Sequence, residues 1–99
     1  MKHDAIFELH LSPVGGRKKP VAAQFTLPIV LGEQTLHECK FDLKDRKMLA
    51  PGETGIAYVR FLRPESLQGK LQIGCTFGLW DRHLIGYGKV LELSKDSVK

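Results

Sequence analysis

Hydrophobic and polar residues alternate along several stretches of this chain, and a period of two is typical of β-strands with one buried face. In residues 71–79, Leu, Ile, Cys, Phe and Leu alternate with Gln, Gly, Thr and Gly. Five further segments show similar alternation, apolar runs or a Gly-rich strand pattern: residues 5–11, 21–31, 34–43, 55–63 and 84–93. The pattern therefore predicts six strands.

Residues 71–93 are predicted to form the hairpin around which the other strands are organised, with its turn at residues 80–83. The expected pairs across this hairpin are Leu79 with Leu84, Phe77 with Gly86, and Cys75 with Gly88. Bulky side chains would then lie over two positions that have no side chain. This arrangement favours a strongly bent sheet that closes on itself.

Two strands are expected to contain irregularities. Pro28 cannot donate a ladder hydrogen bond, so it predicts an edge position, a bulge or a break in the second strand. In the third strand, Leu36 has the opposite parity to Cys39, which predicts a bulge near residues 37–38. Since no helical run is long enough for a crossover, we expect an all-β antiparallel barrel. A β-sandwich has the same periodicity, and the glycines of the last strand favour the barrel.

Length and composition predict a single domain over residues 4–93, followed by a polar tail at 94–99. Of the 99 residues, 42% are hydrophobic, as in soluble globular proteins. Fifteen Lys and Arg against eleven Asp and Glu give a net charge of +4, which permits a polyanionic partner without requiring one. The amino-terminal residues are charged and no apolar run has membrane-spanning length, so we expect a cytoplasmic protein that does not bind membranes.

No arrangement of residues typical of an active site is recognisable, and we expect a protein that is not an enzyme. There is no phosphate-cradling motif, and the histidines and cysteines lack metal-ligand spacing, so no nucleotide, metal or other cofactor is expected. Cys39 and Cys75 are expected to be buried free thiols, unless they face each other across the barrel. His37 lies near Cys39, but side-chain roots two apart on a strand are separated by roughly 7 Å, so we expect a half-exposed histidine beside a buried thiol.

Basic residues occur in two groups, Arg17, Lys18 and Lys19 in one connection and Lys40, Lys44, Arg46 and Lys47 around another. Such groups are typical of solvated loops and also of surfaces that bind nucleic acid. At the predicted hairpin turn, Trp80 either folds back over the barrel mouth or stands exposed beside Arg82. Because Trp and Arg often dominate binding energy at interfaces, Trp80 and Arg82 are the candidate protein contacts.

The order and spacing of several landmarks resemble those of a known domain. These landmarks are Gly15-Gly16-Arg17, Pro20, Gln24-Phe25, Met48, Pro51-Gly52-Glu53, Arg63-Pro64, Phe77 and Ile85-Gly86-Tyr87-Gly88-Lys89-Val90. Together they resemble the carboxy-terminal barrel, domain III, of elongation factor Tu and related translational GTPases, over about residues 4–93. The resemblance implies a six-stranded antiparallel Greek-key barrel. In that family the domain is not catalytic, packs on neighbouring domains, contacts the T arm of aminoacyl-tRNA and binds the exchange factor.

The resemblance covers no GTPase domain, so it does not imply GTP hydrolysis. It implies a binding module in translation, and it places Arg17 and Gln24 where the family has residues on the tRNA side. The expected contacts to tRNA or structured RNA are Arg17, Lys18, Lys19, Gln24, Lys44, Arg46 and Lys47. The alternative is a protein-interaction module that uses the face its relatives bury, either to self-associate or to bind a translation component.

Overall fold

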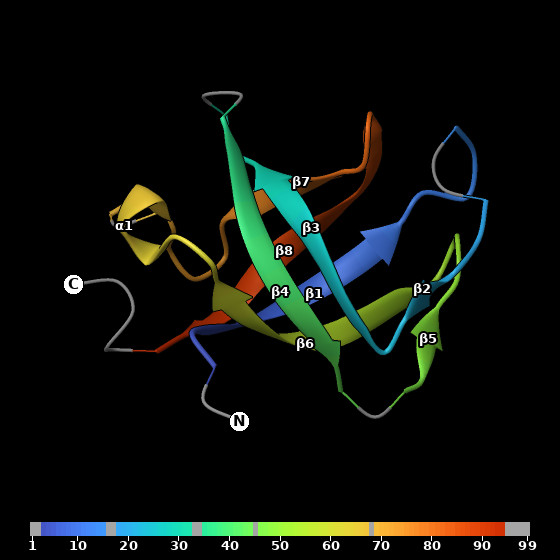
Figure 1. Ribbon diagram of the computed structural model, residues 1–99, viewed down its shortest axis with the longest axis horizontal. Coiled ribbons are helices and arrows are strands. Elements are labelled where there is room, and N and C mark those ends of the chain that lie inside the picture. The colour runs from blue at the N-terminus through green and yellow to red at the C-terminus, as the bar shows by residue number, and fades with distance from the viewer. Residues whose placement is uncertain (1–2, 16–17, 33–34, 45, 68, 95–99) are drawn as a thin grey trace.

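Six antiparallel strands close into a barrel in the computed structural model, which describes residues 3–15, 18–32, 35–44, 46–67 and 69–94 (Figure 1). Around the barrel the order is β1-β6-β4-β3-β7-β8, and β8 pairs with β1. A short ribbon of β2 and β5 lies beside it. The elements are β1 (Ala5–Leu11), β2 (Val21–Ala22), β3 (Gln24–Val30), β4 (Leu36–Leu43), β5 (Met48–Leu49), β6 (Thr54–Phe61), α1 (Pro64–Leu67), β7 (Thr76–Trp80) and β8 (Leu84–Leu93).

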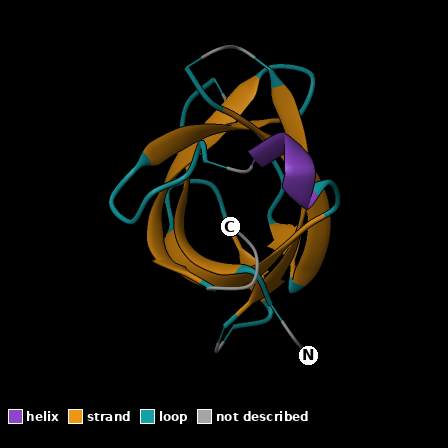
Figure 2. Cartoon of the chain, turned by 90° about the vertical axis from the view of Figure 1, so that its left-hand side faces the viewer, coloured by secondary structure: helices purple, strands orange, loops and turns teal. Residues whose placement is uncertain are grey.

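The topology confirms the all-β class and the closed six-stranded antiparallel barrel. Strands β3, β4 and β6 are consecutive neighbours, and β7 returns to lie beside β3, which is the Greek-key arrangement. Figure 2 looks into the barrel, with α1 beside its opening. Closure removes the β-sandwich alternative, because β1 pairs with both β6 and β8.

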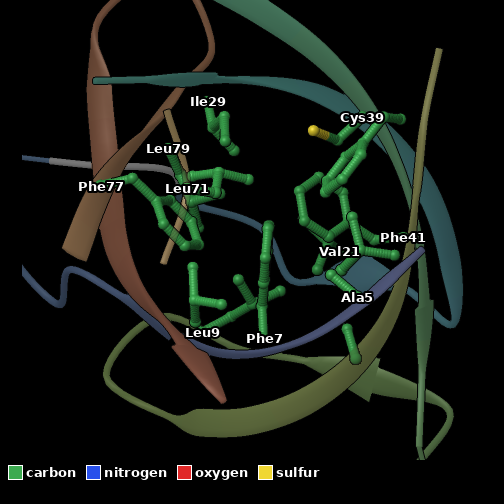
Figure 3. Close-up of a cluster of buried hydrophobic side chains, with 14 of the residues drawn as sticks. Ala5, Phe7, Leu9, Val21, Ile29, Cys39, Phe41, Leu71, Phe77 and Leu79 are labelled. Atoms are coloured by element: carbon green, nitrogen blue, oxygen red, sulfur yellow. The ribbon is translucent and has the colours of Figure 1, made fainter. Parts of the chain in front are cut away.

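The barrel is filled by the inward-facing side chains of its strands, and Phe7 lies at the centre of this core (Figure 3). The ring centroid of Phe7 lies 4.5 Å from that of Phe77, 6.2 Å from that of Phe61 and 6.3 Å from that of Phe41. These rings come from four different strands, β1, β7, β6 and β4. The alternating pattern in the sequence thus supplies one aromatic ring from each of these four strands to a common centre.

The β7–β8 hairpin forms as predicted, but its register is shifted by two residues. Phe77 pairs with Gly88, Leu79 with Gly86, and Trp80 with Leu84. The predicted pairing was wrong for two reasons. In β8, one extra residue lies between Gly86, the partner of Leu79, and Leu84, the partner of Trp80. The turn is also one residue shorter than predicted, and together these changes shift the pairing by two residues. The predicted packing still occurs, since a Cβ atom at Gly88 would lie 2.5 Å from Cζ of Phe77.

Three other details differ from the sequence prediction. Strand β7 begins at Thr76, so residues 71–75 are not part of it. The segment predicted as one strand over residues 21–31 is divided into β2 and β3 at Ala23. The pairing of β4 with β3 is unbroken, so the bulge near residues 37–38 is absent. His37 instead occupies an inward position, which leaves Leu36 facing outward and half exposed.

Candidate functional site

Two cations lie side by side on the outside of the barrel. Lys40 on β4 is directly opposite Arg60 on β6, and Thr26 on β3 is opposite Lys40 on the other side. All three side chains are exposed, and neither cation has an ion-pair partner among the residues that the structure describes. Because like charges directly opposite each other in a sheet are destabilising, an anion placed between Lys40 and Arg60 would relieve this repulsion.

A second row of side chains borders this pair on the same outer surface. Asp42 on β4 lies between Gln24 on β3 and Tyr58 on β6. The ammonium of Lys44 lies 6.0 Å from the centroid of the Tyr58 ring, and the His3 ring lies 4.8 Å from it. We call this outer surface the basic face, and define it by Gln24, Thr26, Lys40, Asp42, Lys44, Tyr58 and Arg60.

Of the predicted RNA contacts, Gln24 and Lys44 belong to the basic face, and Arg46 and Lys47 lie in the connection that follows it. Nη1 of Arg46 lies 3.7 Å from Oε1 of Glu53, with both side chains well exposed, so this charge is partly balanced. The register of β3 and β4 places Asp42 opposite Gln24, with Lys40 and Lys44 two positions either side of Asp42 along the chain.

The first predicted group is separated from the second by the β2–β5 ribbon. Lys18 and Lys19 precede Val21, which pairs with Leu49, whereas Lys47 precedes Met48 at the other end of this antiparallel ribbon. Arg17 lies outside the described residues. Among the described residues, Lys18 and Lys19 therefore lie at the opposite end of this ribbon from Lys47.

The two predicted protein contacts lie at the β7–β8 turn, on strands that are not neighbours of β4 or β6 (Figure 1). Trp80 is half-buried and ends β7, opposite Leu84. Arg82 is exposed, with φ of 67° in the left-handed region. The sequence left open whether Trp80 folds back over the barrel or stands exposed. The half-buried side chain is intermediate between these two alternatives.

The sequence missed the pairing of Lys40 with Arg60. Both residues are recognisable as outward-facing positions of strands, because their neighbours Cys39, Phe41 and Phe61 are apolar. The period of two was thus the available signal, but it does not say which strands are neighbours. The cross-strand register was needed to bring the two cations together.

His37 is buried, with 2% of its surface exposed, so the expectation of a half-exposed histidine was wrong. Its Nδ1 lies 3.1 Å from Oγ of Ser66, and that hydroxyl donates to the carbonyl oxygen of Arg63 at 2.8 Å. Since the hydroxyl proton is used on Arg63, Nδ1–H of His37 is the donor to Ser66. The ring therefore ties β4 to the helical turn α1.

Cys39 is a buried thiol that has no histidine ring as its hydrogen-bond partner. Its Sγ contacts the carbonyl oxygen of His37 at 3.4 Å. Burial, followed by the negative charges of Glu38 and Asp4, raises the pKa of Cys39 from 9.0 to about 12. At neutral pH this thiol is protonated, so the arrangement does not supply an activated nucleophile.

The two thiols are expected to differ in reactivity, because Cys75 is half-buried rather than buried and Cys39 is closed off from solvent. At pH 8, a thiol reagent such as Ellman's reagent should modify one cysteine per native chain rapidly, and the second only after unfolding. The variant Cys75→Ser serves as the control, and it should remove the rapid reaction. Rapid modification of Cys39 in that variant would contradict the burial of this thiol.

Among the described residues, no group of three or more His, Cys, Asp or Glu side chains could hold a metal ion. In the same part of the chain, no helix is long and apolar enough to cross a membrane. No protein-family model matches the chain, and no curated protein is significantly similar to it in sequence. The resemblance to domain III of elongation factor Tu thus stays a prediction from the sequence landmarks.

Proposed function

We propose that this protein is a non-enzymatic binding module that contacts phosphates of a structured RNA, such as tRNA, through the basic face. The observation that carries this proposal is the exposed pair of Lys40 and Arg60, held opposite each other with no ion-pair partner among the described residues. Glu38 and Asp42 lie two positions either side of Lys40 on the same strand face. The sequence landmarks shared with domain III of elongation factor Tu, together with the Greek-key barrel, support tRNA as the RNA.

The chemistry of the basic face suits a sugar–phosphate backbone better than a single base. Lys40 and Arg60 supply positive charge, and the polar side chains of Thr26 and Gln24 lie in the adjacent strand as hydrogen-bond donors. Phosphate contacts of this kind release counterions from the RNA, which makes the affinity depend on salt. Asp42 lies within the surface, so its carboxylate limits how closely phosphates approach Gln24.

Changing Lys40 and Arg60 together to Gln should weaken RNA binding about tenfold or more and reduce the slope of log affinity against log salt by about 1.5. The reason is the loss of two phosphate contacts with no change in the buried core. Fluorescence anisotropy with labelled tRNA, between about 50 and 200 mM salt, measures both quantities.

A control that removes the same charge elsewhere separates local contacts from net charge. The double change of Arg82 and Lys89 to Gln alters two exposed cations on the β7–β8 hairpin. It should leave most of the salt slope intact. Equal losses for the two double variants would contradict a localised phosphate site on the basic face.

A second candidate function, as a protein-interaction module, is favoured by a different surface. Apolar side chains from β4, β3 and β8 form a row on the outside of the barrel, namely Leu36, Val30, Leu84 and Tyr87, and Gly78 is the β7 residue in this row. Leu84 and Tyr87 are 55% and 57% exposed, and Leu84 covers Gly78. Such a surface would self-associate or bind a translation component with little dependence on salt, whereas RNA binding weakens as salt rises.

A further inference from the structure

Asp42 places a carboxylate in the middle of the basic face. It faces outward from β4, directly opposite Gln24 on β3 and Tyr58 on β6. Lys40 and Lys44 lie two positions before and after it along the chain, and residues two apart on a strand share one side of the sheet. A negative group therefore stands between two cations along the chain and between two polar side chains across the strands.

The carboxylate of Asp42 is available to a ligand. Within residues 3–15, 18–32, 35–44, 46–67 and 69–94, no side chain or amide forms a hydrogen bond or ion pair with it. The side chain is half-buried, yet the same part of the chain has no buried side-chain oxygen that lacks a partner. The carboxylate oxygens of Asp42 are therefore open to solvent, where a hydrogen-bond donor can reach them.

The chemistry of an RNA backbone limits which of its groups this carboxylate can contact. An ionised carboxylate only accepts hydrogen bonds, and it repels phosphates because both are negative. The phosphate and ring oxygens of the backbone are acceptors as well, so the ribose 2′-hydroxyl is the backbone donor, and DNA lacks it. Each 2′-hydroxyl of an RNA strand lies between two phosphates. The order Lys40, Asp42, Lys44 has the complementary order of groups: cation, acceptor, cation.

We propose that Asp42 accepts a hydrogen bond from a ribose 2′-hydroxyl and thereby makes the basic face select RNA over a nucleic acid without this hydroxyl. The inference rests on the proposed function and names the residue that discriminates between the two backbones. With a 2′-hydroxyl present, the carboxylate gains a charge-assisted hydrogen bond. Without it, the same carboxylate only repels the neighbouring phosphates. One side chain thus favours the correct ligand and also opposes the wrong one.

A second acidic residue on the same strand provides a matched control for Asp42. Glu38 also faces outward from β4, two positions from Lys40 on its other side. It lies opposite Pro28, and its carbonyl oxygen accepts a hydrogen bond from the amide of Leu62 at 3.2 Å. The side chains of Pro28 and Leu62 have no hydrogen-bonding groups for a ribose. Replacing Glu38 by Ala therefore removes the same charge from beside Lys40 without removing the proposed acceptor.

Fluorescence anisotropy with two labelled probes tests the proposal: a tRNA transcript, and the same sequence with 2′-fluoro in place of each 2′-hydroxyl. Both probes carry the same phosphates, and the fluorine cannot donate a hydrogen bond. The unchanged chain should bind the hydroxyl form about tenfold more tightly than the fluoro form. Asp42→Ala should lower this ratio to about threefold or less. It should also raise the affinity for the fluoro form, because a negative charge leaves the basic face.

The control Glu38→Ala should raise the affinity for both probes and keep the ratio between them. Equal binding of the two probes by the unchanged chain, or an equal fall of the ratio in the two variants, would overturn the role of Asp42. If the probes bind equally and changing Lys40 and Arg60 to Gln still lowers the salt slope, the proposed function stands without this inference. Absence of binding to either probe would overturn both.

Discussion

Replacing Gly86 by Ala is expected to prevent normal closure of the barrel and to lower the free energy of unfolding by at least about 3 kcal/mol. Gly86 on β8 is paired with Leu11 on β1, in the ladder that closes the barrel. An added methyl group would overlap the carbonyl oxygen of His10 and lie 3.1 Å from Cα of Leu11. Both atoms belong to the backbone of β1, so they cannot move aside as a flexible side chain would.

Urea unfolding followed by circular dichroism measures this loss, and two other glycines provide controls. Gly32→Ala should be nearly neutral, because nothing lies within 4 Å of the added methyl group. Gly88→Ala should be destabilising and partly rescued by Phe77→Leu, since the ring of Phe77 supplies the closest contacts and the carbonyl of Glu8 remains at 2.8 Å. A Gly86→Ala variant as stable as the unchanged chain would contradict the close approach of β1 and β8.

The hairpin shows why the sequence predicts packing better than register. Moving Phe77 from Gly86 to Gly88 is a shift of two residues, and a shift of two leaves every side chain on the same face of the sheet. The hydrophobic pattern is therefore the same for both registers. The extra residue in β8 decides between them, and it follows from the geometry of the turn rather than from the alternation of side chains.

His37 shows a second limit of pattern analysis. The opposite parity of the apolar residues Leu36 and Cys39 led to the predicted bulge near residues 37–38, and His37 was expected to be half exposed. The inward position is acceptable because Ser66, 29 residues away along the chain, accepts the Nδ1–H hydrogen bond. Nothing in the local sequence around His37 indicates this distant partner.

The candidate site has the same dependence on distant pairing. The candidate contacts were chosen because basic residues are close together in the sequence, as in Lys18-Lys19 and in Lys44 to Lys47. The β2–β5 ribbon nevertheless lies between these two groups. Lys40 and Arg60 are 20 positions apart and become neighbours only through the register of β4 and β6. Adjacent charges were thus predictable, whereas charges joined across strands were not.

Replacing Phe7 by Ala is expected to lower the free energy of unfolding by about 3 to 5 kcal/mol. The Phe7 side chain is 0% exposed, and its ring contacts rings from three other strands. The cavity left by the substitution would lie inside a closed barrel, in which each strand is hydrogen-bonded to a neighbour on both sides. The core therefore has little freedom to collapse into the cavity. A domain of this size has a total stability of about 5 to 15 kcal/mol, so the variant should unfold at much lower urea.

The variant Phe25→Ala is the matched control, because it removes a phenyl ring from the part of β3 that pairs with β4 but not with β7. Phe25 is half-buried and stacks on Phe41 at 4.8 Å, so its loss should cost clearly less, about 1 to 2 kcal/mol. Urea unfolding followed by circular dichroism compares the two variants directly. Equal losses would mean that Phe7 is not the centre around which the strands pack, and that the part of β3 without a β7 partner is as firmly packed as the rest of the barrel.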